Sequence, residues 1–309
     1  MTENRPRISV LIITYNQQEV IDRTMQSLLS QKDCIYEICI NDDCSTDGTF
    51  AILEGYQRKF PELVKPVRNE ENLGIFRNIE TVQKRPSGDV VYALSGDDEC
   101  PDGYFAKVLE FIEKNDIDWR DESFCIYGDF VQINDDGSSR RFRNNMVLRH
   151  PALKLKIRQL LSERGACYGI RLLRKFPEVA DGRSFAVEMA QDARVQIFSE
   201  RNYYLPEVGN RYYAHIGISS RMSREQMAES AIGCYSFLLF FLESLGIRLD
   251  RKDLAFIEFM TAYKRGKLWR SVVYYFRSID FSLGFGGLQF GRMLFSLQYR
   301  LHRRKAQKH

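Results

Sequence analysis

The feature that most constrains the fold is a regular alternation of apolar runs and amphipathic segments in the first 115 residues. The apolar runs are rich in β-branched residues and occupy residues 8–14, 36–40, 64–67 and 90–94. Short runs without polar alternation are typical of strands buried on both faces of a parallel sheet. Apolar residues at helical spacing lie between the runs, at residues 20–29, 50–59 and 74–83. We therefore predict an α/β fold, a mostly parallel central sheet flanked by helices.

The pattern changes after Asn115. A strand over 124–133 and a turn at 134–137 are expected first, followed by helices over 149–162 and 185–200. From about Ser223 the pattern is helical only, at residues 227–245, 251–264 and 268–278. We predict a first domain over residues 1–220, with halves of about 7–115 and 116–220, and a helical C-terminal region over 221–309.

Composition indicates a globular protein that binds no nucleic acid. The chain is 44% hydrophobic and 28% charged, which is ordinary for a packed core. The net charge is +4, and the cations are spread along most of the chain among similar numbers of acids. The sequence contains no uninterrupted apolar run of about 18 residues, so we predict no membrane-spanning helix. The seven cysteines form no CxxC pair, and the polar N-terminus does not resemble a signal peptide, so we expect a reduced, cytoplasmic location.

Polar clusters follow three of the predicted strands directly. They are Thr14–Asn16, Asp42–Asp43 and Asp97–Asp98. In parallel sheets, ligands bind just beyond the carboxyl ends of the strands, so we expect the clusters to meet at one edge. Adjacent carboxylates repel unless they are neutralised, and Mg²⁺ or Mn²⁺ bridging a diphosphate would neutralise them. Solvated loops with helix-capping acids are the alternative, and Ser45–Thr49 contains good capping residues, so the sequence leaves both interpretations open.

These clusters belong to four short motifs, at residues 8–16, 41–49, 72–78 and 94–98. In order and spacing the motifs resemble the family 2 inverting glycosyltransferases, which have the GT-A fold. The resemblance covers about residues 7–115, is weaker to about 217, and adds nothing beyond 220. It implies inverting transfer of a sugar from a UDP- or dTDP-sugar to a glycan or lipid-linked oligosaccharide, in bacterial surface polysaccharide synthesis (O-antigen or capsule). Residues 7–115 would then form the nucleotide-sugar half of a catalytic domain, and 116–220 the acceptor half.

The resemblance also implies roles for individual residues. Those expected to bind the nucleotide are Thr14, Tyr15 (ring against the base), Asn16, Asp42 (accepting a hydrogen bond from the base), Asn72, Arg77, Asn78 and Asp97 (touching the ribose or a metal-bound water). Asp98 is expected to coordinate Mn²⁺ or Mg²⁺ directly. Many family members carry Asp-x-Asp-Asp here, and Ser95 replaces the first acid, which puts the geometry of the metal site in doubt. Glu99 would be a second ligand or a solvated acid.

The catalytic base is expected on the later helix. The resemblance points to Asp192, although Gln191 replaces the glutamate that often precedes it. Glu188 lies one turn earlier on the same helical face and is the reserve candidate. The alternative is that both are surface acids of an amphipathic helix. His215 ends a segment similar to one near the diphosphate in the family, so it is either a metal ligand or a structural histidine, and Arg211 would pair with a diphosphate oxygen.

The tail and the competing functions stay open. Residues 281–304 are basic and aromatic. They would lie on an anionic membrane surface at the inner face of the cell membrane, or pack against the catalytic domain or a homodimer partner. A nucleotidyltransferase of the same fold is disfavoured, because its glycine-rich phosphate loop is missing from Thr14–Gln17. The remaining alternative is a degenerate, non-catalytic nucleotide-sugar-binding module.

Overall fold

The computed structural model describes residues 5–144, 164–176, 187–214, 216, 223, 243, 246, 251, 254–255, 258–259, 262 and 267–278. The chain divides into two compact units, Met1–Leu238 and Leu239–His309. The boundary predicted near residue 220 falls outside the described residues and stays a prediction.

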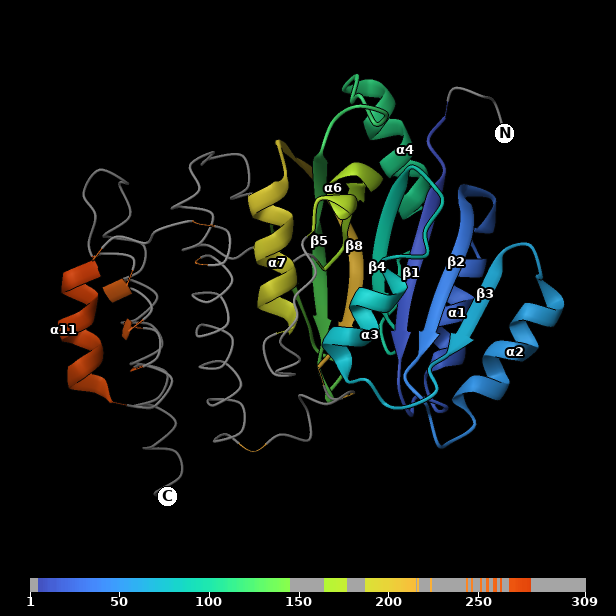
Figure 1. Cartoon of the computed structure of the whole chain (residues 1–309), viewed down its shortest axis with the longest axis horizontal. Coiled ribbons are helices and arrows are strands. Elements are labelled where there is room, and N and C mark those ends of the chain that lie inside the picture. The colour runs from blue at the N-terminus through green and yellow to red at the C-terminus, as the bar shows by residue number, and fades with distance from the viewer. Residues whose placement is uncertain are drawn as a thin grey trace. The chain divides into compact units, whose positions relative to one another are not determined.

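The first unit is built on an eight-stranded mixed sheet in the order β3-β2-β1-β4-β7-β5-β6, with β8 also paired to β5 (Figure 1). Its strands are β1 (Ile8–Thr14), β2 (Ile35–Asp42), β3 (Val64–Arg68), β4 (Val90–Ser95), β5 (Phe124–Ile133), β6 (Ser139–Phe142), β7 (Ala166–Gly169) and β8 (Arg201–Tyr213). The first four strands are parallel to one another, β7 runs antiparallel to β4, and β8 runs parallel to β5.

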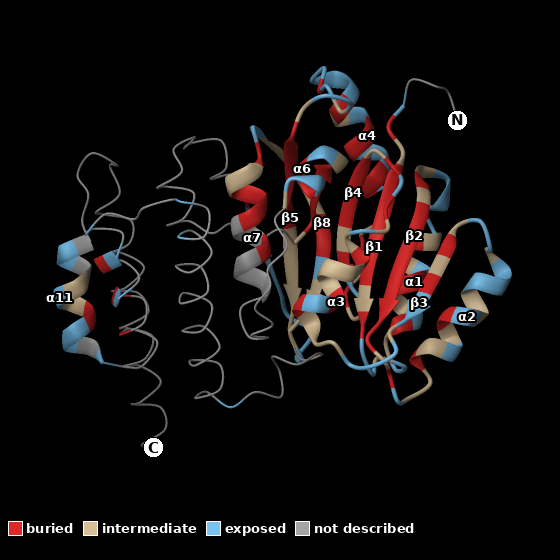
Figure 2. Cartoon of the chain, in the orientation of Figure 1, coloured by how far each residue is buried: buried red, intermediate tan, exposed pale blue. Residues whose placement is uncertain are grey.

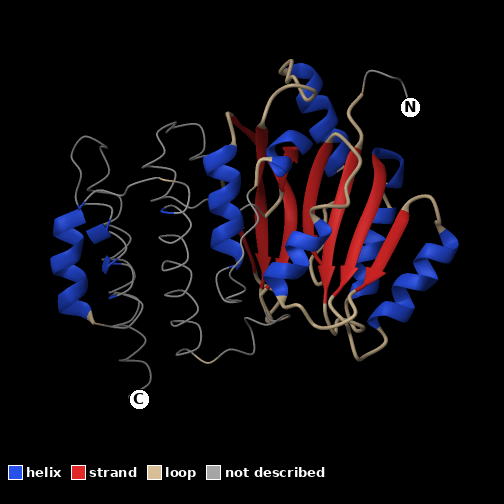
Figure 3. Ribbon diagram, in the orientation of Figure 1, coloured by secondary structure: helices blue, strands red, loops and turns tan. Residues whose placement is uncertain are grey.

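Helices cover both faces of this sheet (Figure 3). Their bounds are α1 (Ile21–Leu29), the 3-10 turn η1 (Lys32–Cys34), α2 (Thr49–Lys59), α3 (Ile75–Val82), α4 (Tyr104–Lys114), α6 (Ile170–Arg174) and α7 (Val187–Phe198). Successive side chains of a strand point to opposite faces, so Val10 and Ile12 pack with α1, α2 and α4, whereas Leu11 packs with α3, α6 and α7. Burial of β1 on both faces explains its nearly unbroken apolar sequence (Figure 2).

The structure matches the predicted rhythm and adds elements that the sequence did not indicate. The four early strands, α1 to α3, β5 and α7 lie where they were expected. Helices α4 and α6 and strands β6, β7 and β8 were not predicted. The predicted helix over 149–162 and the tail over 281–304 lie outside the described residues, as does most of 227–245. In the second unit α11 (Leu268–Ser278) coincides with a predicted helix. Within the described residues, no helix is both long enough and apolar enough to cross a bilayer.

The strand register places the polar clusters at one edge of the sheet. Thr14 on β1 lies opposite Asp42 on β2, and the preceding residue of β1, Ile13, lies opposite Ser95 on β4. Since these three strands are parallel, their carboxyl ends are level, and the loops that follow them begin side by side.

Candidate active site

The loop after β1 is fastened to the loop after β2. Asn16 adopts a positive φ of 51°, its backbone N–H donates to Ser45 Oγ (2.9 Å), and its Oδ1 accepts from the Thr46 N–H (2.8 Å). One residue later the Gln17 N–H donates to Thr49 Oγ1 (2.8 Å). Two of the expected nucleotide-binding segments are therefore held together by the protein itself. Tyr15, which directly precedes these anchors, is exposed.

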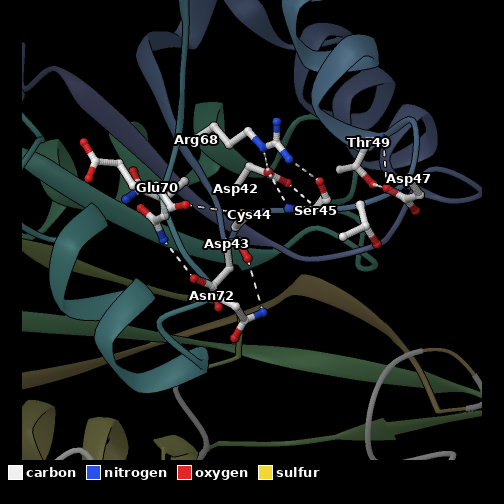
Figure 4. A network of polar contacts seen from close by, with 12 residues as sticks. Asp42, Asp43, Cys44, Ser45, Asp47, Thr49, Arg68, Glu70 and Asn72 are labelled. Carbon is white, nitrogen blue, oxygen red and sulfur yellow. Dashed lines mark hydrogen bonds and ion pairs between the residues drawn. The ribbon is translucent and has the colours of Figure 1, made fainter.

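Asp42 is fully buried at the end of β2, and its carboxylate is engaged within the protein. Its Oδ2 accepts a hydrogen bond from the Ser45 N–H (2.9 Å), its Oδ1 accepts from Ser45 Oγ, and Arg68 Nε lies 3.7 Å from Oδ2 (Figure 4). Burial raises the pKa of Asp42, and the Ser45 hydrogen bonds oppose that rise. The expected contact of Asp42 with a nucleotide base requires Ser45 or Arg68 to shift, and it stays a prediction.

Asp43, which the sequence placed in a polar cluster without a role of its own, organises the segment that leads into α3. Its Oδ1 accepts from Asn69 Nδ2 (2.9 Å) and the Leu73 N–H (2.8 Å), and its Oδ2 accepts from the Gly74 N–H (2.9 Å). Asn72 Nδ2 donates to the Asp43 carbonyl (3.2 Å; Figure 4). A carboxylate that satisfies free N–H groups ahead of a helix stabilises that helix start. Asp43 therefore fixes the position of the expected donor-binding residue Asn72.

The other two residues expected from this motif differ in exposure. Asn78 is buried on α3, where its Oδ1 accepts from Asn69 Nδ2 (2.9 Å) and its Nδ2 donates to the Asn41 carbonyl (3.2 Å). Arg77, its neighbour, is exposed. The structure thus gives Asn78 a positioning role and leaves Arg77 accessible to a ligand.

An open cavity of about 700 Å³ lies at this end of the sheet. It is lined by Arg68, Asn69, Glu70, Glu71 and Leu73. Three of these residues also contact the polar network, because Arg68 reaches Asp42, and Asn69 and Leu73 donate to Asp43. The volume is within the range of pockets that hold small ligands.

The turn that carries Asp97 and Asp98 is anchored to α1. Thr24 Oγ1 lies within hydrogen-bond distance of the carbonyls of Gly96 (2.9 Å) and Asp98 (2.7 Å), and an Arg23 Nη donates to the Asp97 carbonyl (2.6 Å). Gly96, in the same turn, packs closely against the loop after β1. A Cβ at Gly96 would lie 2.4 Å from the Gln17 side chain, closer than atoms can pack.

The two carboxylates of this turn are poorly neutralised. Burial, followed by the negative charge of Asp97, raises the pKa of Asp98 to about 7, although hydrogen bonds from Asn210 and Tyr213 lower it. Burial also raises the pKa of Asp97, against the nearby charge of Arg164. Asp98 is buried and Asp97 half-buried, and raised pKa values of neighbouring acids are typical of functional sites.

Strand β8 brings two residues to Asp98 that the sequence did not identify. Asn210 Nδ2 donates to Asp98 Oδ2 (3.2 Å), and the Tyr213 N–H donates to Asp98 Oδ1 (3.4 Å). Asn210 Oδ1 is buried, and it has no hydrogen-bond partner within the part of the chain that the structure describes. The Tyr213 ring stacks on Arg23, whose guanidinium carbon is 3.6 Å from the ring centre. Strand β8 pairs with β5 and reaches the turn after β4 through the isolated Glu99–Arg211 bridge, so no local sequence pattern indicates these contacts.

Glu99 is paired with cations. Its carboxylate lies 3.1 Å from Arg23 Nε and 3.5 Å from an Arg211 Nη, and Glu99 and Arg211 also pair through their backbones. Glu99 was expected to be a second metal ligand or a solvated acid, and neither expectation anticipated these ion pairs. Arg211, expected on a diphosphate, lies at the same edge of the sheet.

The expected base lies on α7, on the α3 side of the sheet. Asp192 and Glu188 fall within its bounds, Val187–Phe198. The helix is fixed by the buried Arg194, which lies 2.8 Å from Glu80 of α3. His215 lies outside the described residues. Among the residues that are described, no group of three or more His, Cys, Asp or Glu side chains could hold a metal ion.

The sequence was compared with models of known families. The model named Glycosyl transferase family 2 matches residues 9–178, more than half of the 309-residue chain. The chain belongs to glycosyl transferase family 2. The matched residues include β1, β2 and β4 and the aspartates at the carboxyl ends of β2 and β4. The match confirms the family indicated by the four motifs.

Curated relatives resemble the first part of this family 2 chain. TuaG of Bacillus subtilis, whose provisional name is teichuronic acid biosynthesis glycosyltransferase, is 38% identical over 112 residues, which are 36% of this chain and 44% of TuaG. EpsE of Bacillus subtilis, provisionally named a glycosyltransferase, is 28% identical over 110 residues, 36% of this chain and 40% of EpsE. The chain thus spans less than half the length of either relative.

Solved structures share the fold over most of the chain. Staphylococcus aureus TarS 1-349 in complex with UDP-GlcNAc has a TM-score of 0.57 and 21% identity, covering 90% of this chain and 75% of that chain. The mannosyltransferase PcManGT from Pyrobaculum calidifontis, in complex with GDP-Man and Mn²⁺, has a TM-score of 0.56 and 15% identity, covering 89% and 74%. The fold is that of the GT-A glycosyltransferases, as predicted.

Proposed function

We propose that this family 2 protein transfers a sugar from a UDP- or dTDP-sugar to a glycan or lipid-linked oligosaccharide, with inversion at the anomeric carbon. The transfer would be a step of bacterial surface polysaccharide synthesis, such as that of O-antigen or capsule. The observation that carries the proposal is the Asp97–Asp98 pair at the sheet edge where the nucleotide loops begin, with Asp98 buried and bonded to β8 through Asn210 and Tyr213.

The donor would lie across the ends of β1, β2 and β4. The cavity of about 700 Å³ beside Asp43 would take the nucleoside, with the exposed Tyr15 and Arg77 on neighbouring loops available to the base or a phosphate. Thr14, Asn16 and Asn78 are engaged within the protein and would shape the loops. UDP-GlcNAc in the TarS complex favours a uridine donor for this chain.

The residues present fit a divalent cation, Mn²⁺ or Mg²⁺. Asp98 would hold it, with Asp97 beside it and His215 as a further candidate ligand. The buried, unpartnered Oδ1 of Asn210 is an additional oxygen next to Asp98 and would suit the cation or one of its water ligands. When bound, the cation would neutralise the diphosphate and stabilise it as a leaving group. Mn²⁺ in the PcManGT complex supports this assignment.

Asp192 is the proposed base. An inverting transfer is one in-line displacement, so a carboxylate must accept the proton of the acceptor hydroxyl on the face opposite the diphosphate. Glu188 is four residues earlier on α7 and is the reserve candidate. Replacing the true base should lower kcat about 10²- to 10⁴-fold with little change in the KM for the donor. Asp192→Asn compared with Glu188→Gln therefore decides between them.

The test of the whole proposal is turnover of a nucleotide sugar by the purified chain. We expect metal-dependent transfer from a UDP- or dTDP-sugar to a lipid-linked glycan, with the product anomer opposite to the donor anomer by NMR. Ser95 and Gln191 depart from the family pattern and favour a non-catalytic binding module as the second candidate. Tight donor binding without transfer or hydrolysis over many acceptors would select that module, and a product of retained configuration would exclude the inverting mechanism.

A further inference from the structure

The end of the chain has a charge balance opposite to the rest. Residues 259–309 contain eleven lysines and arginines and a single acid, Asp280. Residues 1–258 contain the other 34 cations and 40 acids, which gives them a negative net charge. A strongly basic segment attached to an acidic body indicates a polyanionic partner for that segment.

Helix α11 lies in this basic segment and presents apolar side chains to solvent. Trp269, Val273 and Phe276 are spaced four and three residues apart, so they share one face of the helix. Their exposed fractions are 78%, 37% and 60%, whereas Ser271 on the opposite side is buried. Adjacent exposed apolar side chains on one helix face are uncommon unless they meet a partner.

Two cations lie along the edge of this face. Arg270 and Arg277 are both exposed and follow Trp269 and Phe276 by one residue each, so they lie on the same flank of the apolar stripe. An aromatic stripe with arginines beside it is the pattern of a helix that lies in a membrane interface, with rings among the headgroups and cations at the phosphates. An RNA would pair with the arginines but would leave Val273 and Phe276 in water.

We propose that α11 docks on the surface of an anionic phospholipid bilayer, with Trp269, Val273 and Phe276 entering the headgroup region and Arg270 and Arg277 contacting lipid phosphates. The proposal concerns location and is independent of the transfer chemistry. It concerns residues of α11, whereas the membrane contact expected from the sequence concerned residues 281–304.

Tryptophan fluorescence of the full chain provides the test. The chain has two tryptophans, and Trp119→Phe leaves Trp269 as the only one. In this variant we expect emission typical of a water-exposed indole in buffer, and a blue shift with vesicles of phosphatidylcholine and phosphatidylglycerol. Vesicles of phosphatidylcholine alone should give a much smaller shift, and added salt should reverse it.

Vesicle sedimentation of matched variants separates the two contributions. Trp269→Ser and Phe276→Ser should each weaken partitioning about tenfold. Arg270→Gln and Arg277→Gln should each weaken it about fivefold. All four positions are exposed, so no buried side chain is removed. The control is Arg58→Gln/Lys59→Gln on α2, two exposed cations of the first unit, which should bind like the parent protein.

Several results would overturn the proposal. Emission that is already blue-shifted in buffer would mean that protein covers the face. Vesicle binding that survives the combined loss of Trp269 and Phe276 would assign it to other residues. A shift produced by RNA, or by self-association in light scattering, and absent with anionic vesicles would identify a different partner.

Discussion

Glu37 and Asp98 are two buried carboxylates at opposite ends of the same sheet, and their acidities differ widely. Burial alone would raise the pKa of Glu37, but hydrogen bonds from Lys65, Ser87 and Ser9 lower it to about 2. Asp98 is as deeply buried, and burial with the charge of Asp97 raises its pKa to about 7. Glu37 receives hydrogen bonds from three strands or loops, whereas Asp98 receives two long ones within the described part of the chain.

Ionised Glu37 therefore stabilises the native state, whereas ionised Asp98 destabilises it. A carboxylate that is bonded more strongly when ionised stabilises the native state, and one that is desolvated without compensation destabilises it. Such poorly compensated groups are typical of functional sites. The carboxyl end of the sheet is therefore where a positively charged ligand would be bound most favourably.

The largest effect is expected from Asp98→Asn. Loss of the proposed cation ligand should lower the transfer rate about 10³-fold, measured with donor and Mn²⁺ in excess. The same change removes an unfavourable buried charge, so the free energy of unfolding at pH 8 without metal should stay equal or rise in urea titrations. A large loss of stability with unchanged turnover would contradict this account, because Asp98 would then stabilise the fold, as Glu37 is expected to, and would not be needed for transfer.

Glu37→Gln should show the opposite behaviour. We expect it to lower the free energy of unfolding by up to about 3 kcal/mol at pH 7, because Lys65 loses its partner and two serines lose a charged acceptor. Since the pKa of Glu37 is lowered from 4.5, its contribution is complete above about pH 4.5 and is lost as the pH falls towards 2. Urea midpoints across this range should converge for the parent protein and the variant. Parallel curves would contradict the linkage.

Asn210→Ala tests the contact between β8 and Asp98, the proposed metal ligand. Residues that orient a metal ligand typically contribute about 10- to 100-fold to metal affinity, so Mn²⁺ binding followed by electron paramagnetic resonance should weaken by that factor. Asn202→Ala is the control, because this second asparagine of β8 accepts a hydrogen bond from Ser199 and lies at the other end of the strand. Equal effects of both variants would indicate a general loss of β8 structure.

Ser95→Asp should have the smallest effect. Ser95 is exposed at the end of β4, and a carboxylate there would complete the Asp-x-Asp-Asp pattern that the resemblance implies. One added negative charge near the cation should tighten Mn²⁺ binding about two- to fivefold, and less at high salt. Weaker binding would mean that added repulsion among the acids outweighs the attraction.

Local pattern predicted much of the fold and part of the site. The nearly unbroken apolar run of β1 and the clusters after β1, β2 and β4 were sufficient to place Thr14 beside Asp42 at the carboxyl edge, because parallel strands leave little choice of arrangement. The contact between Asn210 and Asp98 joins residues 112 positions apart, and no local pattern encodes it. The role of Asp43 stayed open because a capping acid and a ligand-binding acid have the same sequence signature, and only the donors around it distinguish them.

The most direct test is the thermal stabilisation of the protein by UDP with and without Mn²⁺, since a ligand that binds only the folded state raises Tm. We expect UDP with Mn²⁺ to raise the Tm of the parent protein, either component alone to have little effect, and the combined effect to be absent in Asp98→Asn. An equal rise with UDP and Mn²⁺ in both proteins would contradict the assignment of the cation and diphosphate to the Asp98 edge.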